Sequence, residues 1–167
     1  EREEKFVGMF YWIWHYPWVN DWAPLTTGSV LDVYPEAVND WSHPAWEQSI
    51  DGRPYFWDEP LYGFYTNTDE YVLRKHAELL ADANIDAVFF DATNPPQVFP
   101  DGYETLCRVW KEAKAQGVNV PQIAFILGFS GGEDARAQLR DIYTNLYSTG
   151  RYDDLFFLWE GKPLVMA

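Results

Sequence analysis

The sequence predicts an α/β fold made of parallel βα units of a (β/α)8 barrel, with about four strands and three helices that form its first half. Strand-like and helix-like segments alternate along the chain, and the strands are continuous apolar runs, as in parallel sheets covered on both sides. The chain of 167 residues ends inside an apolar strand. A whole barrel needs at least about 200 residues. We therefore expect residues 1–167 to be a single, incomplete barrel domain.

A doubly wound open sheet is the alternative architecture for the same alternation of elements. The first strand lacks the glycine-rich motif of nucleotide-binding folds, because "GMFYWIWH" contains one glycine. The segment "GFSGGED", after the third strand, lacks the Lys-Ser/Thr pair of a P-loop. The barrel is therefore the favoured prediction, and no cofactor is expected.

The first strand is predicted at residues 5–14, where Phe10 and Trp12 are expected in the core. Residues 15–68 follow as a long loop rich in Pro, Trp, Asp, Asn and Gly. Such a long loop in a compact domain is usually functional. We expect this aromatic loop to fold over the site.

The next segments predict two helices around a buried strand. Thr68 is the expected N-cap of the first helix and Asn84 its C-terminal stop. A strand is predicted at residues 85–90. The second helix is expected between Asp101 as cap and Gly117 as stop. Its predicted apolar face is Tyr103, Leu106, Cys107, Trp110 and Ala113.

The remaining sequence predicts a strand at residues 121–127, a third helix and two short strands around a turn at 160–163. Gly150 is expected to end the third helix. Its predicted inward face is Leu139, Ile142, Tyr143 and Leu146. We expect "PLVMA", at the end of the chain, to be the fourth core strand.

The acidic composition restricts the partners. Asp and Glu number 26 and Lys and Arg 12, so the formal charge is −14. Repulsion from phosphate groups argues against nucleic acid as a partner. No apolar run approaches the length that spans a bilayer, so no membrane insertion is expected. The chain has one cysteine, Cys107, and no HExxH motif or close histidine pair, so no metal site is expected.

Candidate site residues follow from the strand ends and the aromatic loop, because ligands of parallel α/β folds bind at the C-terminal ends of the strands. Asp91 directly follows "AVFF" and is the first catalytic candidate. Glu59 is the second, because a carboxyl group among aromatic rings can have the raised pKa that a general acid needs. The substrate-binding candidates are Trp14, His15, Trp18, Trp57, Asp58, Tyr62 and Asn94.

The aromatic content predicts the class of ligand. Seven of the nine tryptophans lie before residue 60, mostly outside predicted helices and strands. The flat faces of sugar rings stack on Trp and Tyr, while Asp, Asn and His bind the hydroxyl groups, in keeping with the usual make-up of ligand pockets. We therefore expect an oligosaccharide or polysaccharide as partner.

Several segments resemble a known group of proteins: "VGMFYWIWH", "EPLYGFYTNTDEYVLRKHAELLADANIDAVFFDATN", "VPQIAF" and "DLFFLWEGKPLVMA". They are similar to secreted bacterial glycoside-hydrolase-type proteins, distantly to families 71 and 99, which are (β/α)8 barrels. The resemblance covers nearly the whole chain, as the first half of such a barrel. It implies cleavage of complex glycans. In family 99 the catalytic carboxylates lie on later strands, so the resemblance assigns no catalytic residue here.

The combined prediction is a glycoside hydrolase-like protein that hydrolyses a glycosidic bond of a complex glycan by carboxylate acid/base chemistry. A non-catalytic carbohydrate-binding protein on the same scaffold is the alternative, and a protein–protein surface in the aromatic loop is a third reading. The resemblance implies a secreted, periplasmic or cell-surface location, with a signal peptide outside this sequence. The remaining barrel or a second copy is a further expected partner.

Overall fold

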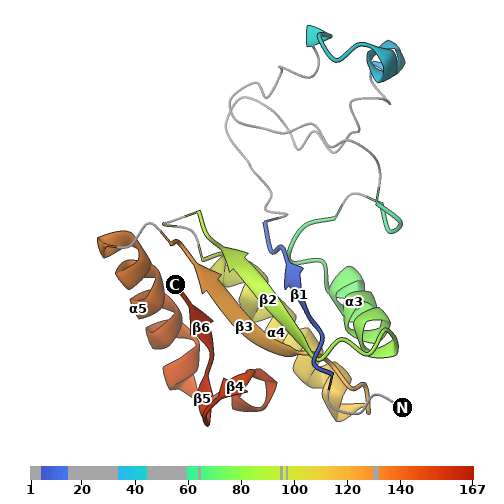
Figure 1. Cartoon of the computed structure of the whole chain (residues 1–167). Helices are drawn as coiled ribbons and strands as arrows, with labels where there is room; N and C mark the ends of the chain where they lie inside the picture. The colour runs from blue at the N-terminus through green and yellow to red at the C-terminus, as the bar shows by residue number, and fades with distance from the viewer. Residues whose placement is uncertain are drawn as a thin grey trace. The chain divides into compact units, whose positions relative to one another are not determined.

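The computed structural model divides into two compact units, which we describe separately: Glu1–Tyr16 with Asn67–Ala167, and Pro17–Thr66. The first contains the sheet and its helices (Figure 1). The residues described are 5–14, 34–44, 60–63, 65–94, 96, 98–129 and 132–167. That residues 1–167 form one domain stays a prediction.

Four parallel strands form the sheet, in the order β1-β2-β3-β6. These strands are β1 (Gly8–Tyr11), β2 (Ala87–Ala92), β3 (Gln122–Leu127) and β6 (Val165–Met166). The helices of this unit are α3 (Glu70–Asp82), α4 (Pro100–Ala115) and α5 (Glu133–Asn145). The order of the strands in the sheet is therefore the same as their order along the chain.

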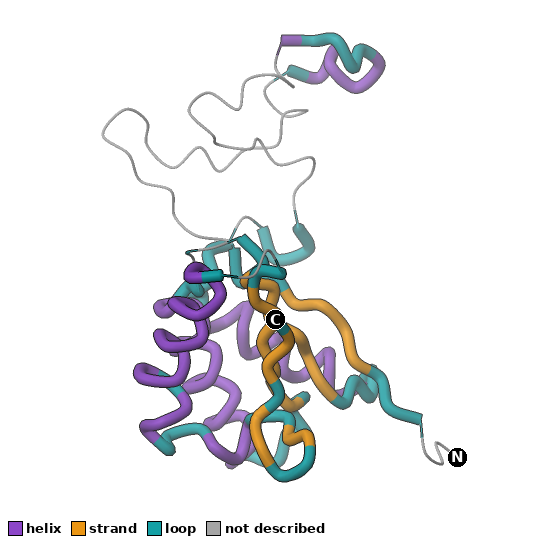
Figure 2. The backbone as a smooth tube through the Cα atoms, turned by 60° about the vertical axis from the view of Figure 1, so that its left-hand side comes forward, coloured by secondary structure: helices purple, strands orange, loops and turns teal. Residues whose placement is uncertain are grey.

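All three helices lie on one face of the sheet (Figure 2). A doubly wound sheet reverses its strand order and carries helices on both faces, whereas a barrel adds each strand beside the previous one with its helices outside. The arrangement here is the barrel type. The predicted fold class is confirmed, and the doubly wound alternative is wrong.

The core lies between the sheet and α4. Side chains alternate along a strand, so Val88 and Phe90 of β2 point to the helices, as does Phe125 of β3. The rings of Phe90 and Phe125 meet edge to face with centroids 5.2 Å apart. The predicted apolar face of α4 is fully buried, at Tyr103, Leu106, Cys107, Trp110 and Ala113.

Two helix starts differ from the prediction. Asp69, not Thr68, is the N-cap of α3, because its carboxylate accepts a hydrogen bond from the Val72 amide at 3.1 Å. The N-cap of α4 is Phe99, which has a left-handed backbone, and Asp101 lies within the first turn. Pro100 restricts the backbone before it and starts the helix with a preset φ angle.

Some residues predicted to face the core are exposed. Phe10 is 62% and Trp12 60% exposed, because they lie on the sheet face that none of the described helices covers. On α5, Ile142 is buried, but Leu139 and Tyr143 are exposed. The buried residues of α5 are Gln138 and Ile142, which are four positions apart and therefore share one face of the helix. Leu139 and Tyr143 each come one residue later, about 100° around the helix, and so lie off that face.

A hairpin precedes the last strand of the sheet. Its strands are β4 (Leu158–Trp159) and β5 (Lys162–Pro163). Glu160 and Gly161 both have positive φ angles, as the two central residues of a type I′ turn do. The predicted turn is confirmed at Glu160 and Gly161, whereas Lys162 and Pro163, also expected in it, belong to β5.

The Pro17–Thr66 unit is described at residues 34–44, 60–63 and 65–66. It contains a short 3-10 helix, η1 (Pro35–Asn39). His43 lies 3.7 Å from a carboxylate oxygen of Glu36 and against the Tyr34 ring. Burial raises the pKa of the Tyr65 phenol.

Candidate functional site

Asp91 lies near the C-terminal end of β2, on the sheet face opposite α4. Its Oδ1 accepts a hydrogen bond from the Thr93 amide at 3.0 Å, and its Oδ2 accepts one from the Trp12 indole Nε1 at 3.1 Å. A neighbouring strand therefore fixes the carboxylate across the sheet. The predicted position of Asp91 at a strand end is confirmed, since β2 ends at Ala92.

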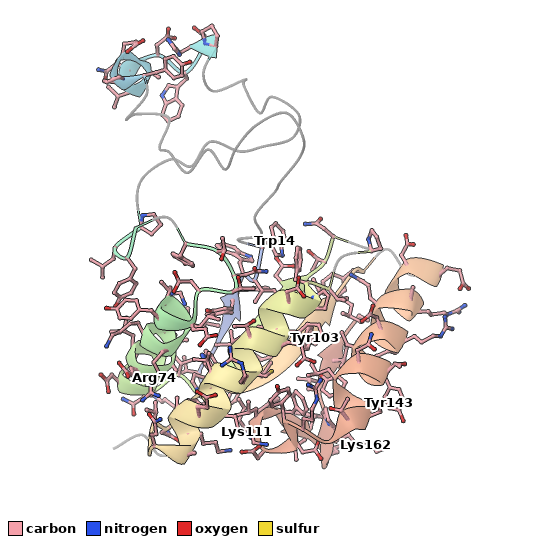
Figure 3. All side chains as sticks on the ribbon, turned by 180° about the vertical axis from the view of Figure 1, so that it is seen from behind. Trp14, Arg74, Tyr103, Lys111, Tyr143 and Lys162 are labelled. Carbon is pink, nitrogen blue, oxygen red and sulfur yellow. The ribbon has the colours of Figure 1, made fainter. Side chains whose placement is uncertain are left out.

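Trp14 lies beside the same residue. Its Nε1 donates to the backbone carbonyl of Asp91 at 2.6 Å. Its ring stacks on Phe99, with centroids 6.4 Å apart and planes 29° apart. Trp14 is 37% exposed, so part of its ring remains accessible. We call Trp12, Trp14 and Asp91 the indole–carboxylate cluster; Figure 3 labels Trp14 at this end of the sheet.

Asn67 holds the backbone between the two tryptophans. Its Nδ2 donates to the carbonyl of Ile13 at 2.9 Å, and both residues are buried. Gly102 of α4 gives the amide room, because a Cβ at this position would lie 2.6 Å from Nδ2 of Asn67. A buried side-chain bond of this kind positions the chain where it leaves β1.

Gln138 joins the ends of the central strands. Its Nε2 donates to the carbonyl of Ala92 at 2.7 Å, and its Oε1 accepts from the Gly128 amide at 3.2 Å. The side chain is 1% exposed, so these hydrogen bonds are shielded from water. The C-terminal edge of β2, next to Asp91, is thereby fixed to α5 and to the end of β3.

No lysine, arginine or histidine among the described residues forms an ion pair with Asp91. Among the described residues, its carboxylate is held by neutral N–H donors. Each carboxylate oxygen has two acceptor positions. The described residues use one position on each oxygen, and the other can take a ligand. The arrangement suits Asp91 to accept a hydroxyl proton or to face a positive centre.

Of the other predicted site residues, the structure describes only Asn94 and Tyr62. Asn94 is exposed, three residues after Asp91, in the loop that follows β2. Tyr62 lies in a turn closed by a hydrogen bond from the Gly63 amide to the Pro60 carbonyl, within the Pro17–Thr66 unit. The rest lie outside the described residues: His15, Trp18, Trp57, Asp58 and Glu59.

Two other reactive side chains lie apart from the cluster: Cys107 is buried in the core, and His76 is half-buried on α3. Burial raises the pKa of the Cys107 thiol well above its usual range, so this cysteine is unsuited to act as a nucleophile. Nδ1 of His76 is 2.7 Å from the hydroxyl of Tyr11, within the packing of α3 against β1. Within the described part of the chain, no group of three His, Cys, Asp or Glu side chains could hold a metal ion. There too, no helix is long and apolar enough to cross a bilayer.

A hollow of about 520 Å³ lies at the opposite, N-terminal edge of the sheet. Asp86, one of its lining residues, already accepts a hydrogen bond from the Val7 amide at 2.7 Å. In barrels of this type, the N-terminal edge serves stability and the C-terminal edge carries the site. The indole–carboxylate cluster is therefore the candidate site.

Sequence reasoning missed three residues of this region: Trp12, Asn67 and Gln138. Trp12 was assigned to the core, although its alternation with Trp14 along the strand places both rings on one face. That spacing, together with a carboxylate at the end of the next strand, was a usable signal. Asn67 and Gln138 act on backbone groups distant in sequence, and no local motif marks such contacts.

Comparison with known proteins gives one informative likeness. No family model and no curated protein matches the chain. The fold is similar to a solved GH99 endo-alpha-mannosidase from Bacteroides thetaiotaomicron, in complex with bis-tris propane. The TM-score is 0.52 at 17% identity, over 97% of this chain. The chain spans 41% of the length of that protein, which is a TIM barrel. This likeness shows the fold.

Proposed function

We propose that this chain is part of a glycoside hydrolase that cleaves a complex glycan, with the indole–carboxylate cluster in its substrate site. The observation that carries the proposal is the Asp91 carboxylate, held by Trp12 at the C-terminal edge of the sheet, with Trp14 on its backbone. Exposed indole surface stacks on sugar rings, and the free acceptor positions of Asp91 take hydroxyl groups. The similar fold of an endo-alpha-mannosidase supports a glycoside-hydrolase scaffold.

Hydrolysis needs a second carboxyl group. The two groups are about 5 Å apart in retaining enzymes and about 6.5–9.5 Å apart in inverting enzymes. Asp91 fits the nucleophile or base, since both of its oxygens accept N–H donors. Glu59 is the proposed acid, in keeping with its aromatic sequence surroundings.

The sheet face without helices is proposed to line the interior of a larger barrel. Phe10 and Trp12 are exposed on this face, whereas interior positions of a closed barrel are filled by packed side chains. The similar structure has more than twice the length of this chain, since 41% of it is matched. Further strands would then cover Phe10, whereas Trp12 would lie with Asp91 at the C-terminal end, facing the substrate. The secreted, periplasmic or cell-surface location and the bacterial source remain parts of the same proposal.

The test is release of new reducing ends from a panel of glycans by the chain and its Asp91→Asn variant. The variant keeps one acceptor oxygen and loses the charge, and we expect turnover to fall about 10²–10⁴-fold. Asp82→Asn is the matched control, because this exposed carboxylate lies at the end of α3 and changes the net charge equally. Unchanged turnover in Asp91→Asn would remove Asp91 from the mechanism.

A non-catalytic carbohydrate-binding protein is the second candidate. It is favoured by the neutral hydrogen-bond donors that the described residues supply to Asp91, which suit recognition of hydroxyl groups as well as chemistry. This function predicts glycan binding that weakens in Trp14→Ala, without product release. New reducing ends from any glycan would exclude it.

A further inference from the structure

We propose that the indole–carboxylate cluster selects a positively charged sugar, an amino sugar with a free ammonium group, over its neutral counterpart. This inference rests on the proposed carbohydrate site and specifies the substrate class that the site takes. Three observations carry it: a carboxylate without an ion-pair partner among the described residues, two indole rings beside it, and the charge of the whole chain.

The first observation is that the charge of Asp91 is not neutralised within the described residues. The ion pairs that are described bring cations to other carboxylates, such as Arg74 to Glu78 within α3 and Lys114 to Asp154. Asp91 receives N–H donors that carry no formal charge. A ligand ammonium at its free acceptor positions would supply the missing positive charge and form a charge-assisted hydrogen bond.

The second observation is the orientation of the indoles. Trp12 and Trp14 both direct their N–H groups at Asp91, to the carboxylate and the backbone carbonyl respectively. An N–H bond lies in the plane of its ring, so these hydrogen bonds leave the electron-rich faces unused. One face of Trp14 stacks on Phe99. The free indole faces can therefore stack on the ring of the sugar whose ammonium group meets Asp91.

The third observation is the formal charge of −14. It produces a long-range attraction for cationic ligands and repels acidic sugars. This general field does not depend on Asp91, whereas the ion pair does. The local and general contributions can therefore be separated by substitution.

The experiment compares two oligosaccharides of equal length and linkage, one of glucosamine and one of N-acetylglucosamine, at a pH where the free amine is protonated. Binding to the whole chain is measured by calorimetry. We expect the glucosamine oligosaccharide to bind about 2- to 5-fold more tightly, which is the size expected of an exposed ion pair. Added salt should reduce this preference, because it screens exposed charges.

Two variants test whether the preference for the charged sugar depends on Asp91. Asp91→Asn should bring the two affinities close together while binding of the neutral oligosaccharide persists. Asp82→Asn should keep the full preference, because it changes the net charge without touching the cluster. Near-UV circular dichroism confirms that both variants fold.

Three results would overturn the inference. Equal affinities in the unsubstituted chain would show that the charge of the ligand does not affect binding. A preference that survives in Asp91→Asn would show that only the general field acts, and the proposed carbohydrate site would stand. Absence of binding to both oligosaccharides and to every glycan of the panel would remove the proposed function together with this inference.

Discussion

The two faces of the sheet use aromatic residues in opposite ways. On the helix-covered face, Trp110 is fully buried and donates its indole N–H to the carbonyl of Leu73 at 3.0 Å. On the other face, Trp12 is 60% exposed and donates to the carboxylate of Asp91. Both indole N–H groups form a hydrogen bond, but only the ring of Trp110 is completely removed from water.

This difference separates stability from recognition. A buried indole stabilises the fold through the apolar area that it removes from water. An exposed indole contributes little of that energy and keeps its area for a ligand. The residues that follow β1 therefore supply the indoles of the candidate site, whereas α4 and the buried face of the central strands hold the unit together.

The largest expected effect comes from truncating one tryptophan on each face. Trp110→Ala should lower the free energy of unfolding by about 3–5 kcal/mol, because it removes a large buried side chain and leaves a cavity. Trp12→Ala should lower it by about 1 kcal/mol or less, since it loses one exposed hydrogen bond. Urea unfolding followed by circular dichroism measures both values.

Glycan binding should show the reverse order. Trp12→Ala should weaken it about 5- to 100-fold, as expected for the loss of about 1–3 kcal/mol of contact with an aromatic residue. Comparable destabilisation by the two substitutions would mean that the two faces are equally covered in the folded chain, and the comparison would fail.

The next effect concerns the hydrogen bonds behind the site. Gln138→Leu leaves the carbonyl of Ala92 and the amide of Gly128 without this partner in a buried place, and each loss costs about 1–3 kcal/mol. Gln116→Leu is the matched control: its exposed side chain accepts from Arg74, and we expect a change within about 0.5 kcal/mol. A similar loss of stability in both variants would contradict the role of Gln138.

The order of elements was predictable from sequence because it depends on local patterns. The apolar face of α4 followed the helical period at five positions, and all five are buried. Gly117 and Asn84 were correctly expected at helix ends, where both have positive φ angles. The N-caps were less predictable, because adjacent residues such as Thr68 and Asp69 can both cap and only the fold selects one.

The site was predictable in part. Asp91 was found because a carboxylate directly after a buried strand has a defined place in a parallel sheet. Trp12 was assigned wrongly, since an apolar run does not tell which face a neighbouring helix covers. Its bond to Asp91 spans 79 residues of sequence, and such pairings depend on the register of β1 against β2.

The smallest effect concerns a tyrosine on the helix-covered face. The hydroxyl of Tyr103 is buried without a hydrogen-bond partner among the described residues. Tyr103→Phe should therefore be neutral or raise the free energy of unfolding by about 1 kcal/mol at neutral pH. Burial, followed by the nearby charges of Asp141 and Glu104, raises the pKa of Tyr103 in the folded state.

The same substitution should change the response to alkaline pH. Because the folded pKa of Tyr103 lies above the unfolded value of about 10, its contribution is complete below that pH and is lost as pH rises further. The melting temperature of Tyr103→Phe should thus fall less steeply above about pH 10 than that of the unsubstituted chain. Buried Cys107 and partly buried Tyr147 also have raised pKa values, so part of the dependence of stability on pH remains in the variant. Tyr143→Phe, on the exposed side of α5, is the control, and an equal flattening there would show that burial against the sheet is not the cause.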